Sequence, residues 1–410
     1  MARPAQILLV GTLAAILPSG AAISQTDPSW VLNNQVQLGD VFSQQTLNVV
    51  DVSDQTVATT TATGNAFQAN AELNDADMRS NQSLQGNVAA DTRVNVTGYS
   101  GDAVVLTTAA SGNTGHAGAY GATMTGVYTQ ITGQTSVSAH SHVEAPSGSA
   151  GNVDSVVQAV GNSQSFGLGY ASAGVRANQT NEASVTSDGG GVYGYVSGIA
   201  SFTATTSGND VSLSGENLSA ARMAVSQTNA AALTQAAQFT AFGNVQESVT
   251  GATVAGNNVT AHNEGPLLDV ASQQTNQSYV RAQSSGAAYL FGAATASAYG
   301  VGNSLSAGAV GGELVLDTVQ INDGGGVEAL AAFSGTEGYD ARTSATAMGN
   351  SITGYACSDC GGRMTVGNSQ TNYSDVGAQS TVEIAGSGRS VQSVSTAVGN
   401  SATYYVTRPE

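Results

Sequence analysis

Residues 192–203 read VYGYVSGIASFT and lead into the dipeptide Gly208-Asn209. Apolar residues alternate with small or polar ones along this stretch, which is typical of half-buried β-strands. A Gly-Asn dipeptide preceded by small residues occurs eight times along the chain, at steps of 46 to 50 residues. The asparagines of these dipeptides are Asn65, Asn113, Asn162, Asn209, Asn257, Asn303, Asn350 and Asn400.

A second motif keeps the same period. It is a glutamine that is followed in most copies by Thr-Asn, and it trails the Gly-Asn asparagine by 17 or 18 residues until the last copy. The glutamines are Gln82, Gln130, Gln179, Gln227, Gln274, Gln320 and Gln370. Two motifs that share one period over most of a chain predict a repeat architecture, in which function resides in an extended surface rather than in one catalytic pocket.

The composition favours strands over helices. Glycine occupies 51 positions, and each glycine inside a helix costs about 1 kcal/mol relative to alanine. Only Pro146 and Pro266 lie between residues 51 and 405, which suits strands rich in Val and Thr. Disorder is disfavoured because 41% of the residues are hydrophobic and only 9% are charged. We therefore expect an all-β fold, an elongated β-solenoid with a period of about 48 residues.

The two motifs divide each repeat into about 18 and 30 residues. We interpret this division as two coils per repeat, which predicts about fifteen coils and a rod roughly 70 Å long at a rise of about 4.8 Å per coil. A single 48-residue coil, or hairpin pairs, would have the same period. Because equivalent turns of a solenoid stack on one another, the recurring amides predict Asn and Gln ladders along the axis. Whether these ladders point inward or outward is left open.

The N-terminal residues predict a secretory signal peptide. Arg3 precedes an apolar run over residues 7–17, which is too short to span a bilayer, and small residues follow it. The next segment fits the repeat poorly, because Gln45 resembles the second motif but precedes Asn65 by 20 residues. The expected organisation is a signal peptide (1–24), an N-terminal cap or atypical segment (25–63), the repeat β-solenoid (64–403) and a C-terminal tail (404–410).

The charge balance excludes some partners. The chain has no lysine, its ten basic residues are all arginine, and its formal net charge is −18. Nucleic acid and anionic lipid are therefore unsuitable partners, since both require compensating cations. The acidic residues are scattered, and no grouping of His, Ser and Asp stands out. We expect no enzymatic activity and no cofactor.

Candidate sites for chemistry are few. Cys357 and Cys360 have the CxxC spacing of redox and zinc sites, but in an exported protein we interpret them as a disulfide that pins a loop of the last repeat. His140, His142 and Glu144 would share one face of a strand, which is compatible with a metal. They occur in one repeat only, so a solvated polar face is the preferred interpretation, and we predict no metal site.

The chain resembles the holdfast attachment protein D (HfaD) family of stalked alphaproteobacteria. The resemblance rests on a signal peptide followed by Gly-Asn and Gln-Thr-Asn repeats, on the lack of lysine, on a β-rich composition of small residues and on a length near 400. It implies a surface protein that, with a curli-like partner and an outer-membrane exporter, anchors an adhesive polysaccharide, the holdfast, to the cell envelope. It assigns no function to individual residues.

An exported, acidic and repetitive protein without a catalytic site suits a structural or adhesive task. We expect recurring Asn, Gln, Ser and Thr groups to bind an adhesive polysaccharide weakly at many points. An alternative function is that of a self-assembling, amyloid-like or coat filament subunit that binds no sugar. Six tyrosines either stack on sugar rings or fill the core: Tyr120, Tyr170, Tyr193, Tyr289, Tyr299 and Tyr355.

Overall fold

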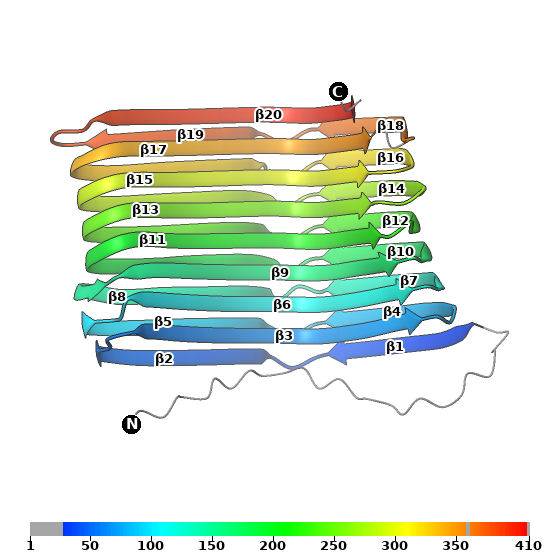
Figure 1. Ribbon diagram of the computed structural model, residues 1–410, viewed down its shortest axis with the longest axis horizontal. Helices are drawn as coiled ribbons and strands as arrows, with labels where there is room; N and C mark the ends of the chain where they lie inside the picture. The colour runs from blue at the N-terminus through cyan, green and yellow to red at the C-terminus, as the bar shows by residue number, and fades with distance from the viewer. Residues whose placement is uncertain (1–27, 358–360, 408–410) are drawn as a thin grey trace.

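The computed structural model describes residues 28–357 and 361–407. These residues form twenty β-strands and no helix, and every pairing between strands is parallel. The described part of the chain accordingly offers no candidate for a membrane-spanning helix. Successive coils stack from the N-terminal coil (blue) to the C-terminal coil (red) in Figure 1. The expectation of an all-β solenoid is confirmed.

Each coil contains three strand segments, and the first segments of all coils form an eight-stranded sheet. Its strands are β1 (Ser29–Gln37), β4 (Ala76–Leu84), β7 (Thr123–Thr132), β10 (Ser172–Asn181), β12 (Ala220–Asn229), β14 (Leu267–Asn276), β16 (Glu313–Asn322) and β18 (Arg363–Asn372).

The second and third segments form a twelve-stranded sheet, in which four long strands each contain both segments. Its strands are β2 (Val41–Asp51), β3 (Gln55–Glu72), β5 (Val88–Tyr99), β6 (Ala103–Tyr120), β8 (Ser136–Ala150), β9 (Asn152–Gly169), β11 (Ser184–Glu216), β13 (Leu233–Asn263), β15 (Tyr279–Ala309), β17 (Val327–Cys357), β19 (Val376–Ile384) and β20 (Ser390–Thr407).

The interpretation of two coils per repeat is wrong, because each repeat forms one coil. Asn113 of β6 pairs directly with Asn65 of β3 on one side and with Asn162 of β9 on the other. Neighbouring strands are thus a full repeat apart in sequence. Eight strands at about 4.8 Å give a stack about 35 Å high, half the expected length, and the longest dimension of the molecule runs along the strands (Figure 1).

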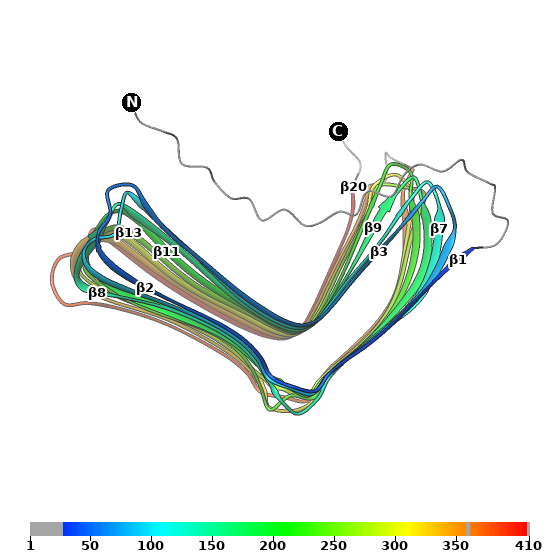
Figure 2. The same cartoon turned by 90° about the horizontal axis from the view of Figure 1, so that it is seen from below.

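The cross-section of the solenoid is bent, as Figure 2 shows, and the long strands turn at its inner corner. The Gly-Asn dipeptide explains this bend. In β9 the buried side chains Val157 and Ala159 are followed by buried Asn162, so the alternation between buried and exposed residues shifts by one position at Gly161. An extra residue of this kind bends a strand, as a β-bulge does.

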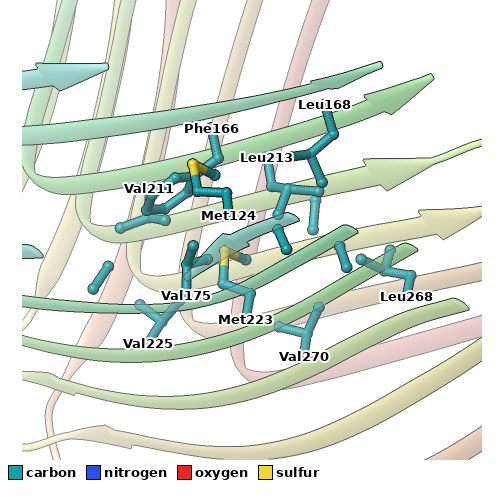
Figure 3. Close-up of a cluster of buried hydrophobic side chains, with 14 of the residues drawn as sticks. Met124, Phe166, Leu168, Val175, Val211, Leu213, Met223, Val225, Leu268 and Val270 are labelled. Atoms are coloured by element: carbon teal, nitrogen blue, oxygen red, sulfur yellow. The ribbon is translucent and has the colours of Figure 1, made fainter. Parts of the chain in front are cut away.

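Hydrophobic side chains fill the space between the walls of each limb. Figure 3 shows the largest such cluster, in which residues of the eight-stranded sheet face residues of β9 and β11. Met124, Val175 and Met223 come from the eight-stranded sheet, and Phe166 and Leu213 come from the opposite wall. Because side chains alternate along a strand, every second residue of each segment enters this core.

The segment that we expected as a cap is a regular coil over its described residues. β1 pairs with β4 at a spacing of 47 residues, and β2 pairs with β5 at the same spacing. Gln35, not Gln45, occupies the glutamine position of this coil, since it pairs with Gln82. At the other end β20 extends to Thr407, so the described part of the expected tail continues the last coil.

Candidate functional site

The eight Gly-Asn asparagines form a continuous ladder inside the protein. In each of the first seven, Nδ2 donates to Oδ1 of the equivalent asparagine in the next coil, over 2.7 to 2.9 Å. Each of the first seven also donates to a backbone carbonyl oxygen of the eight-stranded sheet, as Asn257 does to Thr275 over 2.9 Å. The ladder therefore joins successive coils and also joins the two walls.

The glutamines form a second ladder that runs in the opposite direction. Gln130 Nε2 donates to Gln82 Oε1 of the preceding coil over 2.8 Å and to the Ser163 carbonyl oxygen of the twelve-stranded sheet over 2.8 Å. The same pattern continues from Gln370 back to Gln35. Because all donors of one ladder point the same way, each ladder has a direction, and the two directions are opposite.

A third ladder was not anticipated. The asparagine of the Gln-Thr-Asn motif stacks from coil to coil, as Asn276 Nδ2 shows by donating to Asn322 Oδ1 over 2.8 Å. Leu84 and Thr132 occupy this position in earlier coils, so the ladder begins at Asn181. Its signal was present in the sequence as the last residue of the second motif.

These ladders are buried, which decides their role. Asn257 is fully buried, and Gln227 is 1% exposed. A buried amide that lacks a partner costs free energy, whereas the amides inside these ladders are satisfied within the core, apart from Oδ1 of Asn181, which begins the third ladder. The ladders thus set the register of the coils and present no groups along the length of the solenoid to a ligand. A binding surface has to be sought on the outer faces.

The outer face of the eight-stranded sheet carries an axial groove, which we define by three hollows that share lining residues. They measure about 560, 490 and 340 Å³. Arg79 and Val127 belong to the first two hollows, and Arg176 belongs to the second and third. The groove crosses the strands from β1 to β16, a distance of about 29 Å at the usual strand spacing.

Arginines line the groove at spacings set by the coils. Arg79 and Arg176 lie in one column of outward residues, separated by Val127, so their positions are about 10 Å apart. Arg222 lies in the adjacent column, next to Gly174. A Cβ atom added to Gly174 would meet no atom within 4 Å, which shows that the floor of the groove is open at this point.

Two of these arginines have acidic neighbours. Arg222 Nε lies 3.4 Å from Asp269 Oδ2, and Arg79 Nη2 lies 3.5 Å from Asp77 Oδ2. Within the described residues Arg176 forms no ion pair. The groove therefore offers charged hydrogen-bond donors beside carboxylate acceptors, an arrangement suited to a ligand that has many hydroxyl groups.

Beside the N-terminal end of the groove, the same outward face carries an exposed aromatic ring and several amides. The Arg79 guanidinium lies 5.4 Å from the ring centroid of Trp30, which is 61% exposed. Asn81 Nδ2 donates to Asn34 Oδ1 over 3.2 Å, and Asn178 continues this outward column two coils later. Sequence inspection missed this surface because its members come from different repeats. An alignment of the repeats reveals it, since Arg79 and Arg176 are two periods apart.

The six tyrosines differ in burial. Tyr193 is 1% exposed and fills the core, where burial raises its pKa to about 12. Tyr120 and Tyr170 are exposed, and their rings form an edge-to-face pair with centroids 5.9 Å apart. Tyr289 is also exposed, whereas Tyr299 and Tyr355 are half-buried. None of these six tyrosines lines the axial groove.

The two cysteines and the histidine pair were the other candidates. Cys357 ends β17 and is buried, while Cys360 lies outside the described residues, so the disulfide stays a prediction. His142 Nε2 lies 3.1 Å from Glu144 Oε2, and the His140 ring is directed to another coil. The described residues contain no group of three His, Cys, Asp or Glu side chains that could hold a metal ion.

His140 takes part in a contact between coils. Its Nδ1 lies 3.6 Å from Asp188 Oδ2 of the next coil. The interaction with Asp188 raises the pKa of His140 above the ordinary value of 6.5, and Asp91 of the preceding coil raises it further, while desolvation and Arg93 oppose the shift. Protonated His140 thus lies between two carboxylates, one in the coil before its own and one in the coil after it.

We expect the variant His140→Gln to lose stability in acid only. A pKa raised on folding contributes stability that is fully present below pH 6.5 and disappears as the pH rises through the folded-state pKa. Since the side chain is partly exposed, the loss at pH 5.5 should stay below about 1 kcal/mol. Urea unfolding at pH 5.5 and pH 9 measures how much more stability the variant loses in acid than in alkali. Asp188→Asn, which removes the partner of the charge, should also lose stability in acid. An equal loss at both pH values contradicts the role of charge.

One comparison with known proteins identifies the family of this chain. The family model of holdfast attachment protein D matches residues 50–326, which is more than half of the chain and contains six strands of the eight-stranded sheet. No curated protein and no solved structure matches the chain. The resemblance seen in the repeats is thereby confirmed, and the chain belongs to the holdfast attachment protein D family.

Proposed function

We propose that this protein is exported to the cell surface, where it anchors the adhesive holdfast polysaccharide to the cell envelope. The family membership carries the proposal, because the family is described by holdfast attachment. The signal peptide expected at residues 1–24 lies outside the described residues, and it supports export through its sequence alone. The role is a structural one that requires no catalysis or cofactor.

The axial groove is the surface that we assign to the polysaccharide. It is open, it runs along the stack for seven strands, and a linear polymer can follow it. The exposed Trp30 offers an aromatic face to a sugar ring, and the guanidinium of Arg176 offers donors to its hydroxyl groups. Each contact is weak, but contacts repeated in successive coils add up through multivalency.

The other partners are those that the family resemblance implies, namely further envelope anchor proteins and an outer-membrane exporter. The net charge of −18 argues against nucleic acid as a ligand. Outer-membrane association belongs to the same proposal, and it places one surface of the solenoid against the envelope while the groove remains available to the polysaccharide.

Filling the groove should weaken polysaccharide binding. The double variant Gly174→Phe/Arg176→Glu places a ring in the open floor and reverses one charge, and we expect at least a tenfold loss of affinity for isolated holdfast polysaccharide. Surface plasmon resonance on immobilised polysaccharide measures it. Arg342→Glu is the matched control, since this exposed arginine lies on the twelve-stranded sheet. Equal binding by both variants contradicts the assignment of the groove.

The anchoring role is tested in cells from which the gene is deleted. Flow over glass, with a fluorescent lectin that marks the polysaccharide, should wash these cells away and leave the polysaccharide on the glass. The unaltered chain should restore attachment, and the groove variant should not. Deletion cells that hold fast with their polysaccharide at the pole would contradict anchoring.

A further inference from the structure

Both ends of the solenoid expose unpaired strand edges within the described residues. The strands β1, β2 and β3 of the first coil have neighbours on one side only, and so have β18, β19 and β20 of the last coil. Natural proteins usually protect such edges with proline or with charged residues, especially lysine. These six strands contain no lysine or proline and only four charged residues: Asp51, Glu72, Arg363 and Glu383.

The amide ladders end in complementary groups. The asparagine ladder donates towards the C-terminal coil, so it begins with the Oδ1 acceptor of Asn65 and ends with the Nδ2 donor of Asn400. The glutamine ladder donates in the other direction, so Gln370 ends it with an Oε1 acceptor. Gln35 lies at its other end, where one hydrogen of Nε2 is bonded to the Ala66 carbonyl oxygen and a second remains.

Columns of core residues that begin and end with apolar side chains also reach both ends. Val41 begins a column that passes through β5, β8 and the long strands to Val376 of β19. Leu47 begins another, which ends at Val382. All four side chains are only half-buried, because each lacks a neighbour on one side. In register, a second copy would place valine over valine and leucine over valine.

The path of the chain fits the same arrangement. β20 ends at the end of the molecule where β1 starts, as Figure 1 shows. In every internal coil this is the point where the third segment passes to the first segment of the next coil. A second copy stacked on β18–β20 would therefore continue the solenoid with its own β1–β3.

We propose that copies of this chain stack head to tail, with the C-terminal coil of one copy against the N-terminal coil of the next. At each junction Asn400 donates to Asn65 of the next copy, and Gln35 of that copy donates back to Gln370. A heterologous contact of this kind does not close on itself, so it builds an open fibre. The proposal uses the ends of the solenoid and does not depend on polysaccharide binding.

The test uses the chain purified after secretion by its host, together with variants that place charges in two columns of outward residues that meet at the junction. Thr59 and Thr61 of the first coil would lie over Val394 and Thr396 of the last. All four face outward, and their neighbours within one copy are uncharged. Aspartate at all four positions therefore creates like-charge pairs between copies, while the core and the amide ladders of each copy keep their side chains.

Sedimentation velocity should show assembly of the unaltered chain, and cryo-electron microscopy should show fibres with an axial repeat of about 38 Å, eight coils at about 4.8 Å each. The four-aspartate variant should need about tenfold higher concentration to assemble, equivalent to about 1.4 kcal/mol per junction. Lysine at positions 59 and 61 with aspartate at positions 394 and 396 should restore assembly, because opposite charges then face each other.

Two results would overturn the stacking. The first is an unaltered chain that stays monomeric at every concentration reached. The second is equal assembly of all three proteins, which would show that the contact lies elsewhere on the surface. The groove variant Gly174→Phe/Arg176→Glu serves as a control, since it should assemble normally. Loss of polysaccharide binding and loss of stacking are thereby measured separately.

Discussion

The variant Asn257→Asp should lower the free energy of unfolding by about 3 kcal/mol or more. Asn257 is fully buried, its Oδ1 accepts from Asn209 over 2.8 Å, and its Nδ2 donates to Asn303 over 2.8 Å and to the Thr275 carbonyl oxygen. An aspartate can still accept, but it cannot donate when it is ionised. The substitution therefore buries a charge and leaves two acceptors without their donor.

Urea unfolding at pH 7 measures this loss, and two variants control for it. Asn178→Asp makes the same chemical change in an outward position and should cost less than about 0.5 kcal/mol. Asn400→Asp should fall between the two, because this asparagine ends the ladder and its side chain reaches solvent. If Asn257→Asp costs no more than Asn178→Asp, the ladder does not stabilise the fold.

The second large effect concerns the glycine of the Gly-Asn dipeptide. A Cβ atom at Gly302 would lie 2.6 Å from the Gly349 carbonyl oxygen and 2.7 Å from Asn322 Oδ1. The bend brings the backbones of adjacent coils and the third ladder too close for a side chain. We expect Gly302→Val to destabilise the protein by about 3 kcal/mol or more, since backbone and amides would both have to move.

Gly174→Val is the matched control for this substitution. It is the same change in a strand of the same solenoid, but an added Cβ atom would meet nothing within 4 Å. Because glycine weakens a strand and valine favours it, this variant should gain about 0.5 to 1 kcal/mol. Thermal unfolding of both variants measures the contrast. A similar melting temperature for the two would contradict the steric role of Gly302.

The sequence predicted the class of fold because its period is visible without any structure. Asn209 and Gln227 belong to motifs that recur at one spacing, and only a stack of similar units requires such regularity. The amide residues themselves also predicted ladders, since Asn and Gln recur where side chains lie at the spacing of strands. The family resemblance followed from the same motifs.

The number of coils could not be obtained from that period. Asn162 and Gln179 are 17 residues apart, a distance that equally suits two coils or two walls of one coil. The structure shows the second arrangement, with each residue bonded to the wall that carries the other motif. The first coil was misjudged for a related reason, because Gln45 imitates the motif while Gln35 keeps the period.

The sequence by itself determined the repeat length, the strands and the positions of the amides, because these depend on local alternation and on regular spacing along the chain. Tertiary structure alone decided that the ladders point inward and that the outward residues of separate coils form a groove. Arg79, Arg176 and Arg222 come together only when strands a repeat apart lie side by side. The physical reason is that contacts between coils depend on the register between strands, which the whole stack sets and no single repeat contains.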